Sequence, residues 1–254
     1  ITGFDVLKEK VPWFGKTWGK VILLASLILP LLAYLALFWW LDPLLPHGAL
    51  ISQFALAVIL CAICCFAMRH LIYGIRAKCK KTHVLPKWVM PLMFASTFAP
   101  WYALLIHPLL VGGSALLPLW AAIPLGLLII VFASLMYWST LRSRFSLTHG
   151  LSIYLLFPEE GTRVSKGIYS YIRHPGYGML IYMALGFALL RNNLLAILIA
   201  LIYLIPNLLE SKLEDEELIE RFGEEHRRYV KETPAIFPRL RDLGKFFRLI
   251  FLGT

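Results

Sequence analysis

Six long apolar runs, separated by shorter polar segments, account for most of the chain. They cover residues 21–41, 50–68, 88–106, 115–138, 176–190 and 194–209. Each of the first four is about as long as the ~20 residues that a helix needs to cross a hydrocarbon core. The pattern therefore predicts an all-α, polytopic integral membrane protein with about six transmembrane helices, the last two forming a C-terminal helical hairpin.

The last two runs are short for a membrane-spanning hairpin. They are joined by a turn at Arg191, Asn192 and Asn193. Fifteen residues at ~1.5 Å per residue cover roughly 22 Å, less than the ~30 Å of a hydrocarbon core. Either the helices extend past these bounds or the bilayer thins. In both cases the polar residues at the hairpin ends are drawn toward membrane depth, where they must face a protein-lined pocket or water.

Composition supports the membrane assignment. Of the 254 residues, 59% are hydrophobic and 16% are charged, whereas a soluble domain carries about 25% charged residues. Three of the four cysteines, Cys61, Cys64 and Cys65, lie within an apolar run at helical spacing, with no histidine or carboxylate in that run. We expect them to be small buried side chains, and we predict no metal site.

The basic residues indicate an orientation. The net charge is +10, and Lys and Arg gather before the first run, between the second and third, between the fourth and fifth, and after the sixth. The loops at 42–49 and 107–114 contain neither. The positive-inside rule then places both termini in the cytoplasm. In a chain this apolar, the basic surplus indicates contact with anionic lipid, and we expect no nucleic-acid partner.

A first polar cluster precedes the hairpin, in the sequence GTRVSKGIYSYIRHPGYG. Lys166 and Gly167 predict a turn, and Pro175 suits the first turn of a helix whose free N–H groups favour an anion. Gly176 and Gly178 would let a ligand approach the backbone closely. The alternative is an interfacial anchor of tyrosine and arginine side chains, as in the aromatic belts of membrane proteins.

A second cluster follows the hairpin, in NLLESKLEDEELIERFGEEHRRYVKETPAIFPRL. Helical spacing puts several polar residues on one face; these are Asn207, Glu210, Glu214, Glu217 and Arg221. The helix is expected to end near residues 222–223, or to continue to residue 234 with a break at the glycine. The alternative for the acidic residues is solvated pairs such as Glu217–Arg221 and Glu224–Arg228.

The hairpin returns these two clusters to the same side of the membrane, which the loop charges make cytoplasmic. One cluster supplies cations, an imidazole and a helix N-terminus, and the other supplies carboxylates. A ligand that carries both charges would fit such a site. S-Adenosylmethionine is one such ligand, and other zwitterions would fit as well.

The two motifs also resemble a known family. RVSKGIYSYIRHPGYG, followed by LEDEELIERFGEEHRRYVKETPAIFP, is similar to the isoprenylcysteine carboxyl methyltransferase family and its phospholipid methyltransferase relatives, over residues 141–238. Three positions depart from the pattern: Met179 stands where a glycine is usual, Asp215 where a second glutamate is usual, and His226 where a tyrosine is usual.

The resemblance implies a site for S-adenosylmethionine. Glu214 and Asp215 would hold its methionine end. The other predicted cofactor-binding residues are Lys166, Gly167, Tyr169, Arg173, His174, Pro175, Tyr177 and Gly178. The predicted catalytic residues are Arg173, His174 and Glu210.

These expectations divide the chain into three regions. Residues 1–140 form the N-terminal transmembrane region, residues 141–240 the methyltransferase-like region, and residues 241–254 a basic amphipathic tail on the cytoplasmic leaflet that closes the site or anchors the chain's end. The function expected is S-adenosylmethionine-dependent methylation of a lipidic or small apolar acceptor, like an isoprenylcysteine carboxylate. Two alternatives remain: an NADPH-dependent enzyme like the sterol reductases, or a transporter or scaffold. The sequence leaves the acceptor and the oligomeric state open.

Overall fold

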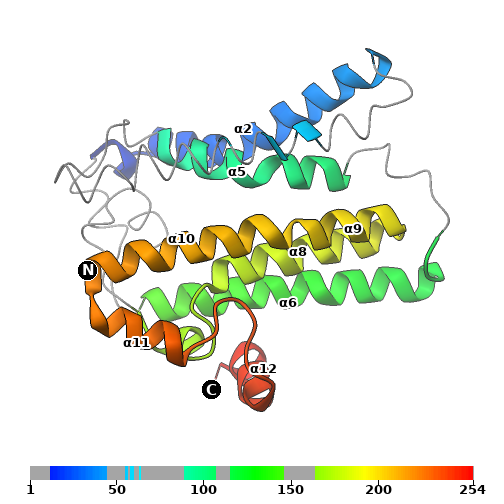
Figure 1. Ribbon diagram of the computed structural model, residues 1–254. Coiled ribbons are helices and arrows are strands. Elements are labelled where there is room, and N and C mark those ends of the chain that lie inside the picture. Colours follow the sequence, from blue (N-terminus) through cyan, green and yellow to red (C-terminus); the bar gives the residue numbers. More distant parts are fainter. Residues whose placement is uncertain are drawn as a thin grey trace. The chain divides into compact units, whose positions relative to one another are not determined.

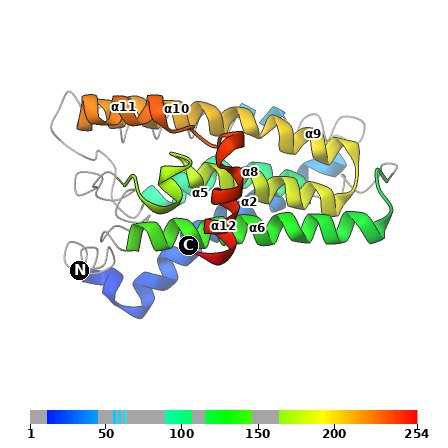
Figure 2. The same cartoon turned by 90° about the horizontal axis from the view of Figure 1, so that it is seen from below.

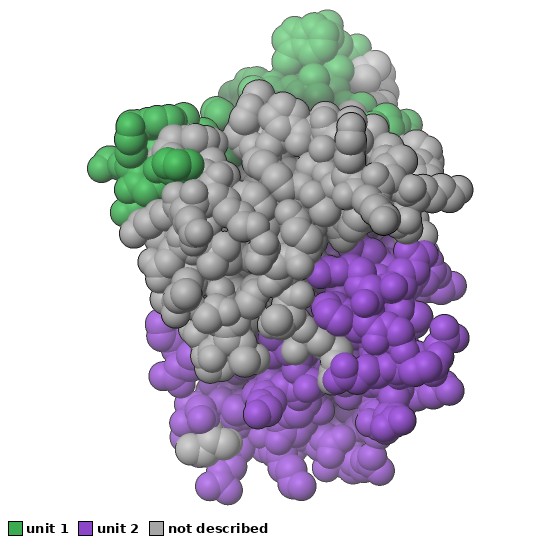
Figure 3. Space-filling view, turned by 90° about the vertical axis from the view of Figure 1, so that its left-hand side faces the viewer, with its two compact units in different colours: residues 1–112, 149–161 green, residues 113–148, 162–254 purple. Residues whose placement is uncertain are grey.

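The computed structural model describes residues 12–44, 55–56, 58–59, 63, 89–106, 115–145 and 164–253. Within these ranges the protein is helical and contains no strand, as predicted. The predicted second span, residues 50–68, lies mostly outside them, as do all four cysteines. The chain divides into two compact units, residues 1–112 with 149–161 and residues 113–148 with 162–254 (Figure 3).

The first unit contains two long helices that pack against each other, α2 (Thr17–Leu41) and α5 (Val89–Ile106). Short 3-10 turns, η1 (Pro12–Gly15) and η2 (Asp42–Leu44), flank α2. Large side chains such as Phe38 and Trp101 are buried in this unit. Pro30 and Pro100 lie inside the two helices without ending them, which membrane helices tolerate when neighbouring groups satisfy the freed carbonyls.

The second unit is a bundle in which α8 (Pro175–Arg191) lies between α6 (Leu119–Phe145) and α10 (Leu204–Phe222) (Figures 1 and 2). A 3-10 turn, η6 (Gly167–Ser170), precedes α8, and α9 (Leu194–Ile202) leads into α10. After α10 come α11 (Glu224–Glu232), η7 (Leu240–Asp242) and α12 (Leu243–Leu252). Helix α6 runs through residue 140, where the sequence analysis placed a boundary between regions.

The hairpin has arms of unequal length. Helix α8 has 17 residues, whereas α9 and α10 join at Tyr203 into one helical stretch of 29 residues, Leu194–Phe222, which is apolar in its first part and charged in its second. The joint falls near Pro206, which has no N–H to bond to the carbonyl of Ile202. At ~1.5 Å per residue the long arm measures roughly 43 Å and extends beyond a bilayer core. The sequence left two explanations for the short hairpin, longer helices or a thinner bilayer. For the second arm, the helix is longer than the apolar run.

The hairpin turn is formed by two asparagines. Asn192 adopts the left-handed conformation (φ 54°, ψ 37°) that ends α8, and the Asn193 side chain accepts a hydrogen bond from the Ala196 N–H (2.8 Å) at the start of α9. The Asn192 side chain also accepts from the Leu117 N–H (3.0 Å) and donates to the Leu117 carbonyl (2.7 Å). The predicted turn is confirmed, and it is tied to the segment that enters α6.

Three described helical stretches are long and apolar enough to cross a membrane: Thr17–Leu41, Leu119–Ser143 and Leu194–Phe222. They fit an integral membrane protein. The count of six spans and the cytoplasmic placement of the termini stay predictions.

Helices α6 and α8 approach closely where two glycines face each other. A Cβ on Gly186 would lie 2.6 Å from Ile130 Cγ1 and 3.0 Å from the Gly126 carbonyl oxygen, and a Cβ on Gly126 would lie 3.0 Å from the Gly186 carbonyl oxygen. Small residues let helix backbones pack closely in a membrane, where dispersion contacts replace the hydrophobic effect. This contact fixes α8 against α6.

We expect Gly186→Val to lower the unfolding temperature in detergent, because the added side chain forces the two helices apart at a cost of about 1–3 kcal/mol. Gly244→Ala in α12 is the matched control, since its Cβ would meet no atom within 4 Å. Equal unfolding temperatures for Gly186→Val and the wild type would contradict this close packing.

Candidate active site

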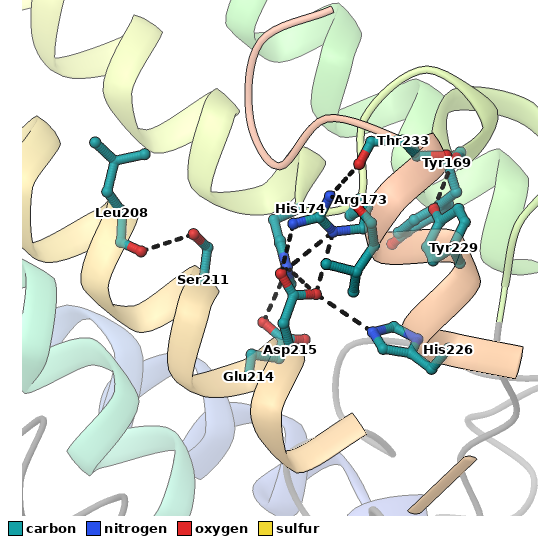
Figure 4. Close-up of polar contacts among 11 residues, drawn as sticks. Tyr169, Arg173, His174, Leu208, Ser211, Glu214, Asp215, His226, Tyr229 and Thr233 are labelled. Carbon is teal, nitrogen blue, oxygen red and sulfur yellow. Dashed lines mark hydrogen bonds and ion pairs between the residues drawn. The ribbon is translucent and has the colours of Figure 1, made fainter. Parts of the chain in front are cut away.

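The two polar segments meet where α8 begins. His174 is the residue before α8, and the extended chain at this point pairs with the segment that follows α11. The Arg173 N–H donates to the Pro234 carbonyl (2.9 Å) and the His174 N–H donates to the Ala235 carbonyl (2.8 Å). Both side chains then point toward α10 (Figure 4). The site is therefore built from the start of α8, from α10, and from α11 with the segment after it.

Arg173 joins these elements through its guanidinium group. Nη2 forms an ion pair with Asp215 Oδ2 at 2.6 Å, and Nε lies 3.2 Å from both Asp215 oxygens. Nη1 donates to the carbonyl of Val230 (2.9 Å) and to that of Thr233, at the C-terminus of α11. A cation is favourable at a helix C-terminus, where carbonyls lack partners. Only one N–H, on Nη2, is left without an acceptor among the described residues.

His174 lies between two carboxylates. Its Nδ1 is 3.2 Å from Glu214 Oε2, and its Nε2 is 3.0 Å from Asp215 Oδ1. Ionised carboxylates only accept hydrogen bonds, so both ring nitrogens must donate, and the ring is an imidazolium. Burial by itself lowers the pKa of His174, but the charges and hydrogen bonds of Glu214 and Asp215 outweigh it and raise the pKa to about 9. His174 therefore has no lone pair with which to accept a proton at neutral pH.

Asp215 also accepts from His226, which the sequence analysis named only as a departure from the family pattern. His226 Nε2 lies 3.3 Å from Asp215 Oδ1, and the His226 ring is buried (Figure 4). Gly223, with φ 62°, ends α10 and lets α11 fold back, which brings His226 to Asp215. The Nδ1 atom of His226 is buried with no hydrogen-bond partner among the described residues. The break at the glycine was the only sequence signal for this contact.

We call Arg173, His174, Glu214, Asp215 and His226 the buried polar cluster. Two cations, the guanidinium and the imidazolium, balance two carboxylates. The side-chain exposures are 9% for Arg173 and Asp215, 3% for His174 and 17% for Glu214. Breaking a buried pair by removing one partner leaves an uncompensated charge and is strongly destabilising, so the cluster holds its four segments together. Glu214 is its most accessible charge.

The aromatic residues near the cluster support it from two sides. The Tyr177 ring lies 5.8 Å from that of His174, and Tyr177 is half-buried. The Tyr229 hydroxyl donates to the carbonyl of Tyr169, which is buried in η6. Pro175 is the first residue of α8, as predicted.

The glycines of the first motif have different surroundings. Gly167 has a positive φ of 62°. The backbone N–H of the next residue, Ile168, donates a hydrogen bond to Ser143 Oγ (3.2 Å), so this turn packs on α6. A Cβ on Gly178 would meet Met136 Cε at 3.2 Å and the Ile236 carbonyl oxygen at 3.4 Å, whereas one on Gly176 would meet nothing within 4 Å. At Gly178 the space that we expected a ligand to use is therefore filled by Met136 and Ile236 of the protein, whereas the space beside Gly176 is open.

The polar face of α10 is rotated from the predicted one. The buried row consists of Asn207, Ser211 and Asp215, while Glu214 and Glu217 lie beside it and are partly accessible. Glu217 pairs with Arg221 at 4.0 Å, as the alternative for the acidic residues expected, but the two side chains are 11% and 17% exposed and therefore not solvated.

Three further residues are placed on the surface or beside the cluster. Glu224 pairs with Arg227 (2.9 Å) rather than with Arg228, because three residues as well as four separate neighbours on a helix surface. Lys166 is exposed before η6, and Glu210 is half-buried one turn before Glu214. The catalytic and cofactor-binding roles of the predicted site residues stay predictions.

This fold and this cluster define a helical membrane protein with a charge-balanced site at the end of an apolar hairpin. Residues 125–220 match the model of the isoprenylcysteine carboxyl methyltransferase (ICMT) family. The family resemblance predicted from the motifs is thus confirmed over most of α6, all of α8 and α9, and most of α10, and this part of the chain is methyltransferase-like. Comparisons with curated proteins and with solved structures gave no match.

We expect the protein to lose stability as the pH rises from about 6.5 through about 9. The pKa of His174 is raised from 6.5 to about 9 in the folded protein, so its contribution is complete below the lower value and is lost as the folded imidazolium deprotonates. The measurement is the unfolding temperature against pH for the wild type and for His174→Gln. Parallel curves for the two proteins would show that His174 is not the group that titrates.

Proposed function

We propose that this protein transfers a methyl group from S-adenosylmethionine to a carboxylate on a lipidic or small apolar acceptor. The observation that carries the proposal is the pair of carboxylates around His174, with Nδ1 at 3.2 Å and Nε2 at 3.0 Å from them. An imidazolium held in this way cannot act as a general base. The acceptor that this site suits is one that reaches it already ionised.

A carboxylate acceptor meets that condition. S-Adenosylmethionine, when bound, supplies a methyl group on a sulfonium, which makes the methyl carbon electrophilic. One acceptor oxygen forms the new O–C bond as the S–C bond breaks and its electron pair returns to sulfur. The products are a methyl ester and S-adenosylhomocysteine, and no proton moves. The protein's contribution is then to bind and orient the two molecules and to exclude water.

A thiol or an amine acceptor would need to lose a proton. Within the buried polar cluster, the one ring nitrogen without a hydrogen-bond partner among the described residues is His226 Nδ1, and it is buried. The guanidinium cannot accept a proton and His174 already carries two, while Asp215 accepts from three side chains and Glu214, in this proposal, binds the cofactor's ammonium group. The cluster therefore favours an acceptor that is anionic at neutral pH.

The residues present fit the polar groups of the cofactor. Glu214 is the accessible carboxylate of the cluster and suits the cofactor's ammonium group. Asn207 is fully buried on the same helix, and its Oδ1 has no hydrogen-bond partner among the described residues, so it can accept from a ligand N–H or O–H. The N-terminus of α8, with open space beside Gly176, suits a carboxylate.

Arg173 has a different role in this proposal from the one first expected. Its contacts with Asp215, Val230 and Thr233 use nearly all of its donors. It therefore positions α8, α10 and α11 around the site. Asp215, which accepts from three side chains, has the same positioning role.

The apolar part of α10, which precedes Glu214 along the helix, exposes large side chains that suit contact with an apolar acceptor. Ile205, Leu208 and Leu209 are 57%, 42% and 57% exposed, and they lie one to three turns before Glu214. An acceptor with an apolar tail could lie along this surface in the membrane while its carboxylate reaches the site. The sterol-reductase and transporter alternatives have no observation of this kind in their favour, and the matched family is a family of methyltransferases.

The binding of S-adenosylhomocysteine to the purified protein tests the proposed cofactor. We expect calorimetry to detect binding to the wild type and a roughly tenfold weaker affinity for Glu214→Gln, which corresponds to the loss of about one charge-assisted hydrogen bond. Glu224→Gln is the control, because Glu224 is exposed and pairs with the exposed Arg227. Binding of NADPH in place of S-adenosylhomocysteine would favour the reductase, and equal affinities for the two variants would misplace the site.

The pH dependence of methyl transfer tests the acceptor class. With a prenylated cysteine carrying a free carboxylate, we expect the single-turnover rate to be nearly constant between about pH 6 and pH 8, because neither the acceptor nor His174 changes its charge in that range. Transfer of a radiolabelled methyl group into base-labile ester measures it. A rate that rises about tenfold per pH unit, with the label in a base-stable product, would instead indicate a thiol or amine acceptor.

A further inference from the structure

The C-terminal segment 239–253 carries more basic than acidic residues. It contains Arg239, Arg241, Lys245 and Arg248 against a single acid, Asp242. Arg241 lies 3.7 Å from Asp242, and its side chain is 73% exposed. In the part of the chain that the structure describes, no carboxylate forms an ion pair with the other three basic residues. The segment thus presents a net positive surface.

One side of α12 packs against the body of its unit. Phe246 and Ile250 are 1% and 6% exposed, in a core that also contains Met136 of α6 and Ile168 and Tyr169 of η6. Helix α12 therefore covers η6, the turn that leads into Arg173 and His174. The position of α12 therefore affects how this turn presents Arg173 and His174, although α12 lies outside the residues that match the family.

The other side of the segment exposes large apolar residues. Leu240, Phe247, Phe251 and Leu252 are 87%, 42%, 51% and 70% exposed. They flank the basic residues, so the segment has a buried face, an exposed apolar border and a basic outer face. Such a helix is typical of a position in the plane of a membrane interface, with its apolar residues in the acyl region.

The contacts of α12 with α6 place it at that depth. Helix α12 lies crosswise to α6 (Figures 1 and 2), and the Phe132 ring lies 5.5 Å from Phe247 and 6.2 Å from Phe251. Further along α6, Arg142 stacks on Trp138 at 5.6 Å, a combination that marks the interface end of a spanning helix. Phe132 precedes Trp138 by six residues, or roughly 9 Å. That agrees with the ~5–10 Å to which interfacial helices bury their apolar side.

The C-terminus of α12 lies near the interface end of α6. A Cβ on Gly253 would lie 2.8 Å from Arg142 Nη1, so the C-terminus of α12 lies beside Arg142. Its aromatic residues are then level with the acyl chains near Phe132, while its terminus is level with the headgroups near Arg142. A helix that crosses α6 here has its outer basic face available to lipid phosphates.

We propose that α12 is an interfacial helix that docks on a leaflet containing anionic phospholipids and thereby holds η6 against α6. The aromatic residues alone would suit a neutral membrane as well. The three basic residues without ion pairs among the described residues favour a negatively charged surface, since each Lys or Arg near such a surface gains about fivefold in binding. The lipid composition then affects the turn that leads into Arg173 and His174.

Hydrogen–deuterium exchange on the full-length protein in nanodiscs tests this proposal without any cofactor. The amides of residues 243–253 are compared in phosphatidylcholine and in phosphatidylcholine mixed with phosphatidylserine. We expect their exchange to be slower in the anionic discs by roughly ten- to a hundredfold, the product of two to three basic residues, and the difference to shrink at high salt. Exchange at residues 168–172 is expected to slow in parallel.

The variants separate lipid binding from simple packing. Replacing Arg239, Lys245 and Arg248 by glutamine should abolish the difference between the two kinds of disc, while the exchange in neutral discs stays as in the wild type. The matched control replaces Arg227, Arg228 and Lys231, three exposed basic residues of α11, and should keep the difference. Equal exchange of wild-type α12 in both discs, or an equal effect of the two triple variants, would overturn the proposal whatever the outcome of the S-adenosylhomocysteine experiment.

Discussion

The Asp215 carboxylate is the group on which the arrangement of the site depends. It accepts hydrogen bonds from Arg173, His174 and His226. Arg173 and His174 lie just before α8 and His226 lies on α11, while Asp215 itself lies on α10. A carboxylate with so many charged donors is stabilised in its ionised form at a buried position. Without it, the side chains of Arg173, His174 and His226 would meet in a buried space with one remaining carboxylate.

The charge balance around Asp215 also limits the chemistry. His174 is held by two carboxylates, and Arg173 is held by one carboxylate and two backbone carbonyls. Both side chains therefore act as fixed cations, which suits the binding of an anion or the orientation of a zwitterion more than proton transfer. The same contacts connect the hairpin to α11 and so join the apolar part of the unit to its polar end. Methyl transfer to a group that is already ionised is a reaction that such a site can support with the residues it has.

The sequence was sufficient for features that depend on local pattern. The apolar runs predicted helices, the two asparagines predicted the turn after α8, and Pro175 and Gly223 marked helix ends, because each of these signals acts within a few residues. It also brought Arg173, His174, Glu214 and Asp215 together, through the hairpin and the family resemblance. Their separation of about forty residues is bridged by the hairpin, whose two arms return the chain to the same end of the unit.

Other features depend on contacts that leave no pattern. Arg173 binds the carbonyls of Val230 and Thr233, and any residue type supplies a carbonyl. His226 reaches Asp215 only because α11 folds back at Gly223, and the fold-back angle is not encoded in the spacing of polar residues. The rotation of the polar face of α10, which buries Asn207, Ser211 and Asp215 rather than the row through Glu210, follows from packing against α8. The short first arm and the continuation of the second arm past Pro206 were both anticipated, and α10 ends at Phe222, where the sequence predicted a helix end.

The protonation state of His174 tests the central claim most directly. Nitrogen-15 NMR of the protein with labelled histidine, assigned by comparison with His174→Gln, reports whether each ring nitrogen carries a proton. At neutral pH we predict that both nitrogens of His174 are protonated, with deprotonation only near pH 9, where its pKa lies. A neutral His174 with one unprotonated nitrogen at pH 7 would contradict the account, because that nitrogen could serve as a base and the argument for an ionised acceptor would no longer hold.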